Sequence, residues 1–156
     1  MRRYKIIIQY DGSFFSGWQL QKDKITVQGE IENALKIITN SKERITIKGS
    51  GRTDAGVHAI GQVAHFDIDT SLKEEELKNA INYYISNHCK IMSISLADNN
   101  FDSRYDAIKR TYIYQLYAGS SILYSNQAWL VNSVDIEILN LLAEEVLGEH
   151  DFLSFS

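Results

Sequence analysis

The sequence has 156 residues with 44% hydrophobic and 23% charged residues, which is typical of a soluble globular protein of about one domain. It contains no run near the roughly 20 apolar residues that cross a bilayer, and the apolar run at residues 6–8 is too short for a signal peptide. The single cysteine excludes an intramolecular disulfide and favours a cytoplasmic protein, while the net charge of −4 argues weakly against a nucleic-acid partner.

The beginning of the chain predicts a strand, a loop and a helix. Residues 4–10 are β-branched and aromatic, as in a strand, and residues 11–17 supply turn chemistry. Thr26 is a suitable N-cap for a helix whose apolar residues recur at helical spacing: Val27, Ile31, Leu35 and Ile38. Residues 44–48 then predict a second strand.

The next segment predicts a further strand, helix and strand. Residues 64–69 alternate apolar and polar side chains, with His65 among those expected to face solvent. Ser71 and Glu74 have the spacing of a capping box, which predicts the start of a helix. A fourth strand is predicted because Met92, Ile94 and Leu96 alternate with serines. The order β-α-β-β-α-β indicates an α/β protein of the α+β type, a ferredoxin-like antiparallel sheet with two helices on one face.

The remaining residues predict the start of a second subdomain. Residues 111–117 read as a fifth strand, in which Tyr114 and Tyr117 are expected in the core. One more strand is expected near residues 129–131, and Asp135 caps a final helix that ends at Gly148. We therefore expect a first subdomain at residues 1–107 and an incomplete second one at residues 108–156.

The loop of residues 49–56 carries the strongest candidate chemistry. It holds Arg52 and Asp54 between glycines that permit sharp turns and a close approach by a ligand. One interpretation is a functional loop that presents a reactive carboxylate. The other is an ordinary hairpin loop in which Asp54 accepts backbone hydrogen bonds and pairs with Arg52. The histidines and Cys89 lack zinc-ligand spacing, so no metal is expected.

The segment GRTDAGVHA, residues 51–59, resembles the motif of the tRNA pseudouridine synthases of the A type. The similarity extends in the same order to YDGS and GWQ in the first loop and to TVQ at the first helix. It continues through GQV and HFD after the candidate loop, then RTYIY and GEHDF. The resemblance covers essentially the whole chain and implies the pseudouridine synthase fold.

This resemblance implies an isomerase that converts uridine to pseudouridine in the anticodon stem-loop of tRNA, at tRNA positions 38 to 40. It further implies a homodimer that needs neither metal nor organic cofactor. Asp54 would be the catalytic carboxylate, and the target uridine must be flipped out of its helix to reach it. Arg52 would fill the vacated space or bind phosphate, Tyr112 would stack on the uracil, and Arg110 would also bind substrate.

Members of that family continue through a second half that resembles the first. This half supplies a basic partner for the aspartate and apolar residues of the uracil pocket. We therefore expect an incomplete fold here and no activity from these 156 residues alone. The alternative is a non-catalytic RNA-binding or dimerisation remnant of the family, and a third possibility is a different uridine-acting enzyme that acquired the same loop.

Overall fold

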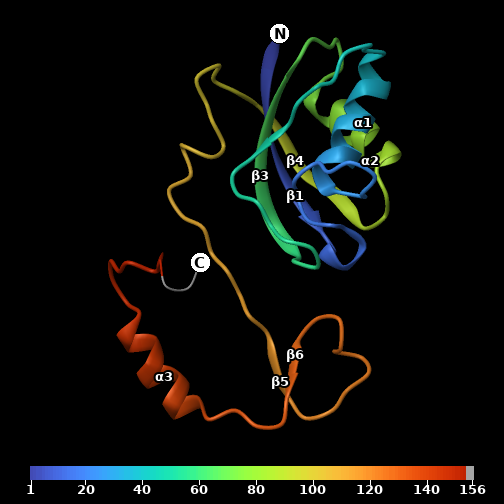
Figure 1. The fold of residues 1–156 in the computed structure, drawn as a ribbon. Coiled ribbons are helices and arrows are strands. Elements are labelled where there is room, and N and C mark those ends of the chain that lie inside the picture. Colours follow the sequence, from blue (N-terminus) through green and yellow to red (C-terminus); the bar gives the residue numbers. More distant parts are fainter. Residues whose placement is uncertain (154–156) are drawn as a thin grey trace. The chain divides into compact units, whose positions relative to one another are not determined.

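The computed structural model describes residues 1–153, and the chain divides into two compact units, Met1–Arg110 and Thr111–Ser156 (Figure 1). The subdomain boundary expected after residue 107 stays a prediction, and residues 154–156 of the expected second subdomain lie outside the described residues. No helix in the described part of the chain is both long and apolar enough to cross a membrane.

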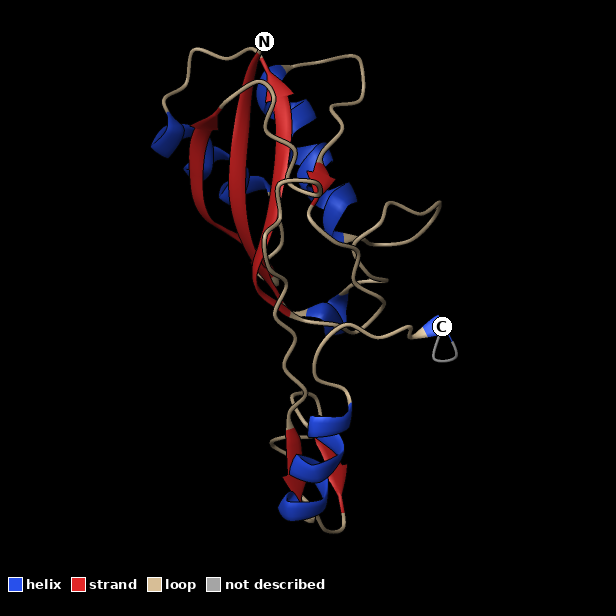
Figure 2. Ribbon diagram, turned by 90° about the vertical axis from the view of Figure 1, so that its left-hand side faces the viewer, coloured by secondary structure: helices blue, strands red, loops and turns tan. Residues whose placement is uncertain are grey.

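The first unit is a four-stranded antiparallel sheet with the strand order β2-β3-β1-β4. Helices α1 and α2 lie on one face of this sheet (Figures 1 and 2). The elements in chain order are β1 (Arg2–Tyr10), the short 3-10 helix η1 (Gly12–Phe14), α1 (Val27–Thr39), β2 (Lys48–Gly49), β3 (Ala59–Ile68), α2 (Glu74–Tyr84) and β4 (Cys89–Ala97). The predicted ferredoxin-like α+β fold is confirmed.

The core lies between the sheet and the two helices. Alternate residues of β1 are buried because successive strand side chains point to opposite faces. They pack with the apolar stripes of α1 and α2, and each fully buried aliphatic side chain contributes about 1.5–3 kcal/mol. The largest buried apolar residues of the first unit are Tyr4, Ile6, Ile8, Ile31, Leu35, Ile47, Phe66, Leu77, Ile81 and Ile91. As expected, Thr26 caps α1, with its Oγ1 accepting from the N–H of Gly29 at 3.2 Å.

The strand predicted at residues 44–48 is wrong over most of its length, since β2 contains only Lys48 and Gly49. Ile47 is nevertheless buried, and side chains of α1 satisfy its backbone. Its N–H donates to Glu32 Oε1 at 3.0 Å, and its carbonyl accepts from Gln28 Nε2 at 3.1 Å. Polar side chains of a helix therefore replace the neighbouring strand that this segment would otherwise require.

The start of α2 differs from the predicted capping box at Ser71 and Glu74. The helix begins at Glu74 itself, and its N-cap is Lys73, whose backbone N–H donates to Glu76 Oε2 at 2.9 Å. A glutamate three residues past the cap still satisfies the cap N–H, as in a capping box. The same chemistry is present, two residues further along the chain.

Strand β4 contains an irregularity that changes which side chains face the core. Ile8 pairs with Ile91 and Ile7 pairs with Ser93, so Met92 is an extra residue on one strand. Consequently Ile91 is buried whereas Met92 is 46% exposed. The predicted alternation, which placed Met92 on the same face as Ile94, is wrong at this point.

The segment after β4 covers part of the second face of the sheet. The N–H of Ser103 donates to Nδ1 of His65 at 3.1 Å, and its hydroxyl donates to the carbonyl of Lys48 at 2.8 Å. Arg3 pairs with Asp67 at 2.6 Å and also donates to the carbonyl of Phe101. His65 is therefore buried, contrary to the prediction that it faces solvent.

The second unit contains the parallel strands β5 (Leu116–Ala118) and β6 (Trp129–Val131) and the helix α3 (Ile136–Glu145). Asp135 caps α3 as predicted, accepting from the N–H groups of Glu137 and Ile138 at 3.0 and 3.1 Å. The helix ends before the predicted stop at Gly148, and none of its residues is buried.

The fifth strand expected at residues 111–117 is wrong over most of that range, because residues 111–115 are irregular. Tyr114 is 90% exposed, so its predicted place in the core is also wrong. β-propensity reflects packing on a pleated, half-buried surface rather than an intrinsic backbone preference. Strand pairing begins only where the N–H of Trp129 donates to the carbonyl of Gln115 at 2.7 Å.

Candidate active site

The loop between β2 and β3 is held in a defined conformation at its base and at its tip. At the base, the N–H of Ser50 donates to the carbonyl of Val63 at 2.8 Å, and Gln62 Nε2 donates to the carbonyl of Gly51 at 2.5 Å. At the tip, the N–H of Val57 donates to the carbonyl of Asp54 at 3.2 Å. These bonds close a turn in which Arg52, Asp54 and Ala55 are exposed to solvent.

The loop that follows β1 packs directly against this turn. The N–H of Trp18 donates to the carbonyl of Thr53 at 2.9 Å, and the hydroxyls of Thr53 and Tyr10 are hydrogen-bonded at 2.8 Å. Burial raises the pKa of the Tyr10 phenol, so it stays a neutral hydrogen-bonding group. Gly17 has a φ of +90°, and a Cβ there would lie 2.6 Å from the Thr53 carbonyl oxygen. Only glycine allows this backbone approach.

A second contact joins the same two loops beyond Asp54. The N–H of Gly12 donates to Nδ1 of His58 at 3.2 Å, and that nitrogen lies 3.0 Å from Asp11 Oδ1. Asp11 also accepts from the hydroxyl and the N–H of Ser13. The Ser13 hydroxyl, above all, holds the pKa of the Asp11 carboxyl below its ordinary value. Asp54 is therefore flanked on both sides in the sequence by contacts to the first loop.

Asp54 lines a cavity of about 510 Å³. The cavity walls are residues of the two loops: Ser16, Gln19, Gln21, Lys24, Arg52, Thr53, Asp54 and Ala55. Within the described residues, the Asp54 carboxylate makes no hydrogen bond or ion pair, and neither does the Arg52 guanidinium. The two side chains are not paired with each other, in contrast to the ordinary-hairpin interpretation.

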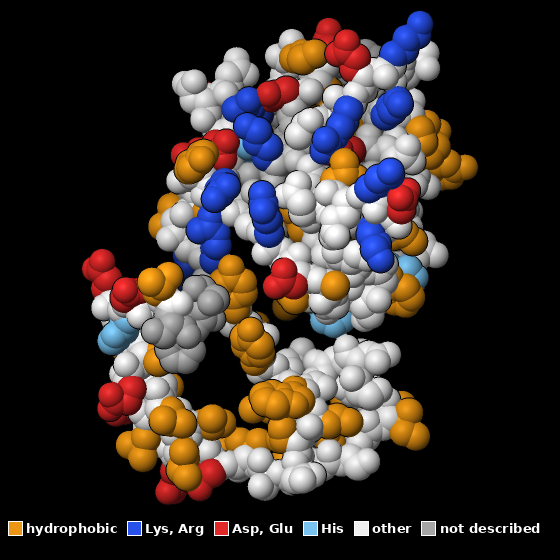
Figure 3. Space-filling view, viewed as in Figure 1, with side chains coloured by type: hydrophobic (Ala, Val, Ile, Leu, Met, Phe, Trp, Pro, Cys, Tyr) orange, Lys and Arg blue, Asp and Glu red, His pale blue; other side chains and the backbone are white. Residues whose placement is uncertain are grey.

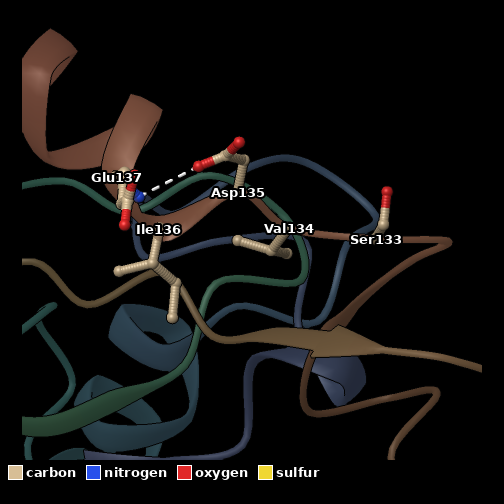
Figure 4. Close-up of a pocket in the computed structure, with 5 residues that line it drawn as sticks. All are labelled: Ser133, Val134, Asp135, Ile136 and Glu137. Carbon is tan, nitrogen blue, oxygen red and sulfur yellow. Dashed lines mark hydrogen bonds between the residues drawn. The ribbon is translucent and has the colours of Figure 1, made fainter.

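Another hollow, of about 560 Å³, lies at the start of α3 (Figure 4). It is lined by five consecutive residues, 133–137, and none of these is basic. Its Asp135 already accepts the helix N–H groups as the N-cap. Although slightly larger, this hollow offers no arrangement of side chains from separate elements, and the Asp54 cavity is the better candidate for a site.

Basic side chains are confined to the first unit. All 16 Lys and Arg residues occur within residues 1–110, and several of them are visible on the face of this unit that Figure 3 shows. The charged residues beyond Arg110 are exclusively acidic: Asp135, Glu137, Glu144, Glu145, Glu149 and Asp151. Among residues 1–153, no three His, Cys, Asp or Glu side chains are grouped so as to hold a metal ion.

The matching family model is described as tRNA pseudouridine synthase, and it covers residues 6–106. This range contains most of β1, all of β2, β3 and β4, and the loop with Asp54. The chain belongs to the tRNA pseudouridine synthase family. The resemblance found in the sequence is thereby confirmed.

Three relatives, each named tRNA pseudouridine synthase A, show how far the similarity extends. The protein of Maridesulfovibrio salexigens is 42% identical over 99% of this chain and 58% of its own length. That of Ehrlichia chaffeensis is 45% identical over 98% of this chain and 64% of its own length. That of Afipia carboxidovorans is 37% identical over 99% of this chain and 64% of its own length. The chain thus spans about 58 to 64% of the length of these family members.

The four site residues expected from the family resemblance are distributed over both units. Arg52 and Asp54 line the same cavity. Arg110 donates to the carbonyls of Ser50 and Arg104 at 2.7 and 2.9 Å, so its guanidinium supports the base of the loop. Tyr112 belongs to the second unit, where its side chain is 69% exposed in an irregular segment. The substrate-binding roles of Arg52, Arg110 and Tyr112 stay predictions.

The contribution of the first loop to the cavity is not predicted by any local pattern in the sequence. Lys24 and Gln21 lie some thirty residues before Asp54 in the sequence, and the contacts of Gly17 and Trp18 with Thr53 bring their loop to the site. A signal was nevertheless present. A buried tryptophan, Trp18, is followed by the polar run QLQKDK, which no predicted element explained.

Proposed function

We propose that the protein isomerises uridine to pseudouridine in tRNA, with Asp54 as the catalytic carboxylate. The observation that carries the proposal is an exposed carboxylate, without a hydrogen-bond or ion-pair partner among the described residues, in a cavity that also contains Lys24 and Arg52. Membership of the tRNA pseudouridine synthase family supports the same reaction. Both carboxylate oxygens are available to a ribose that enters the cavity.

The reaction requires chemistry that a single carboxylate can begin. The bond between N1 of uracil and C1′ of the ribose breaks, and a bond forms between C5 and C1′. C5 then loses a proton and N1 gains one, so the product is an isomer and no oxidant or second substrate is consumed. Asp54 either attacks as a nucleophile or stabilises the positive charge that develops at the ribose.

The proposed substrate is the anticodon stem-loop of tRNA, at tRNA positions 38 to 40. A uridine stacked in RNA reaches a carboxylate only after extrusion from its helix. In this proposal Arg52 takes the vacated space or a phosphate, Tyr112 stacks on the extruded base, and Arg110 assists substrate binding. Because cations occur only within residues 1–110, this unit supplies the charged contacts to the RNA backbone.

Two further features belong to the proposal. The protein acts as a homodimer, which sedimentation or light scattering of the full-length protein would test. It acts in the cytoplasm, where its tRNA substrate would be found. A monomeric mass at working concentrations would contradict the first of these, without bearing on the chemistry of Asp54.

The decisive experiment replaces the carboxylate. Asp54→Ala and Asp54→Asn should reduce tritium release from tRNA labelled at C5 of uridine by at least about a thousandfold, because the group that starts the reaction is removed. The affinity of each variant for tRNA should stay within about twofold of the affinity of the protein without the substitution. Asp69→Asn is the matched control, since that carboxylate is also exposed but does not line the cavity.

Each outcome separates the alternatives. Turnover that survives in Asp54→Ala would show that this carboxylate is not catalytic. Tight tRNA binding by the full-length protein without any pseudouridine would instead favour the non-catalytic RNA-binding remnant.

A further inference from the structure

We propose that Lys24 is a phosphate-binding residue of the Asp54 cavity, which takes the backbone phosphate next to the nucleotide that enters it. This inference rests on the proposed function and adds a substrate contact on the first loop. It would make the site a composite of two loops, with one cation from each: Arg52 from the loop that carries Asp54, and Lys24 from the loop after β1.

The loop that carries Lys24 has a defined conformation. The N–H of Ser16 donates to the carbonyl of Ile25 at 2.8 Å, which closes the base of the loop. Gln21 Nε2 donates across it to the carbonyl of Ser16 at 2.7 Å. Asp23 has a φ of +58°, a left-handed conformation that aspartate adopts in turns. The chain therefore reverses immediately before Lys24.

The same loop is fixed relative to the catalytic turn. Trp18 is 2% exposed, and its ring lies against Gly49. The backbone N–H of Trp18 donates to the Thr53 carbonyl. Gly17 approaches the backbone of Thr53 and Asp54 too closely for any other side chain. The position of Lys24 relative to Asp54 is thus set by backbone contacts of buried residues, as a substrate-positioning group requires.

The charges of the cavity suit a phosphodiester. Asp54 is the only acidic residue among those that line it, whereas Lys24 and Arg52 are basic. Within residues 1–153, Lys24 makes no ion pair and donates no hydrogen bond, so its ammonium is not used to hold the fold. An ammonium group binds phosphate as a point charge. The Lys24 ammonium would hold a phosphate of the RNA backbone at the cavity while the Asp54 carboxylate reaches the ribose.

The experiment compares two lysines of one loop in the full-length protein. Lys24→Ala should raise KM and Kd for tRNA about fivefold and leave kcat within about twofold, because a phosphate contact contributes to substrate and transition state alike. The dependence of log Kd on log salt concentration should become shallower by about 0.7–0.9, the loss of one phosphate contact. Lys24→Arg should restore most of the affinity.

Lys22→Ala is the matched control, since Lys22 is exposed on the same loop but does not line the cavity. It should leave KM, Kd and the salt dependence unchanged. Equal effects of both substitutions, or no effect of Lys24→Ala, would overturn the proposal. Asp54→Ala, assayed in parallel, reports on the proposed function separately: if it retains turnover, the catalytic assignment fails whatever the lysine variants show.

Discussion

Cys89 is a buried thiol at the first residue of β4 and belongs to the hydrophobic core. Burial raises its pKa to about 12, so the reactive thiolate is scarce at neutral pH. We predict that the folded protein reacts with a maleimide or disulfide reagent at least about a hundredfold more slowly than the unfolded protein does. The reaction is followed by the change in absorbance of the reagent. Residues 1–156 contain one cysteine, so within them this change reports on Cys89 alone. Rapid stoichiometric labelling of the folded protein would contradict the burial.

At the residue scale, the sequence identifies side chains that stand in a recognisable pattern. Arg52 and Asp54 were predicted as site residues because residues 51–59 resemble the family motif, whereas the glycines of the loop alone left two interpretations open. Lys24 was not predicted, since its proximity to Asp54 arises from the contact between Gly17 and Thr53. No local pattern encodes a contact between two loops separated by a whole helix.

At the element scale, Glu32 on α1 substitutes for a strand neighbour. Its carboxylate is buried and accepts from Arg44 at 2.6 Å, from the N–H of Ile47 at 3.0 Å and from Gln28 at 2.9 Å. We predict that Glu32→Ala lowers the free energy of unfolding by about 2–3 kcal/mol, because it leaves several buried donors without an acceptor. Urea denaturation followed by circular dichroism measures the loss.

Glu43→Ala is the control for this substitution. Glu43 is an exposed glutamate close to the same segment, and the described residues show its side chain in no ion pair. The substitution should change stability by less than about 0.5 kcal/mol. A Glu32→Ala protein as stable as this control would show that the side-chain bonds do not hold residues 44–47 in place.

Elements that depend on nearby residues were predicted more accurately than elements that depend on partners distant in the sequence. The strand at β1 and the cap of α1 at Thr26 were correct, because alternation and capping act within a few residues. The strands expected at residues 44–48 and 111–117 were mostly wrong. A β-rich sequence becomes a strand only where a partner is present, and here Glu32 takes the partner's place in the first case.

At the scale of the whole molecule, the contact of His65 with Ser103 explains why the first unit continues past β4 to Arg110. Burial lowers the pKa of His65, and Arg3 and Lys48 act in the same direction against the opposing carboxylates of Asp102 and Asp67. The folded protein therefore holds this ring neutral, whereas the unfolded chain protonates it below about pH 6.5.

This difference in proton binding gives a pH dependence with a definite sign. Because the unfolded state binds more protons, stability is highest above the ordinary pKa of histidine and falls as the pH is lowered through it. We predict that the urea midpoint decreases between about pH 7.5 and pH 5.5. His65→Gln should flatten this dependence, because it removes the buried ring that titrates. An unchanged slope in His65→Gln would contradict the prediction.

The confinement of lysine and arginine to residues 1–110 has a practical consequence for proteolysis. Trypsin cleaves after lysine and arginine, and the last such residue in the sequence is Arg110, at the end of the first unit. A complete digest cuts the first unit into many fragments, whereas residues 111–156 contain no internal site for trypsin. The last cleavage site for trypsin within residues 1–156 therefore coincides with the boundary between the two units.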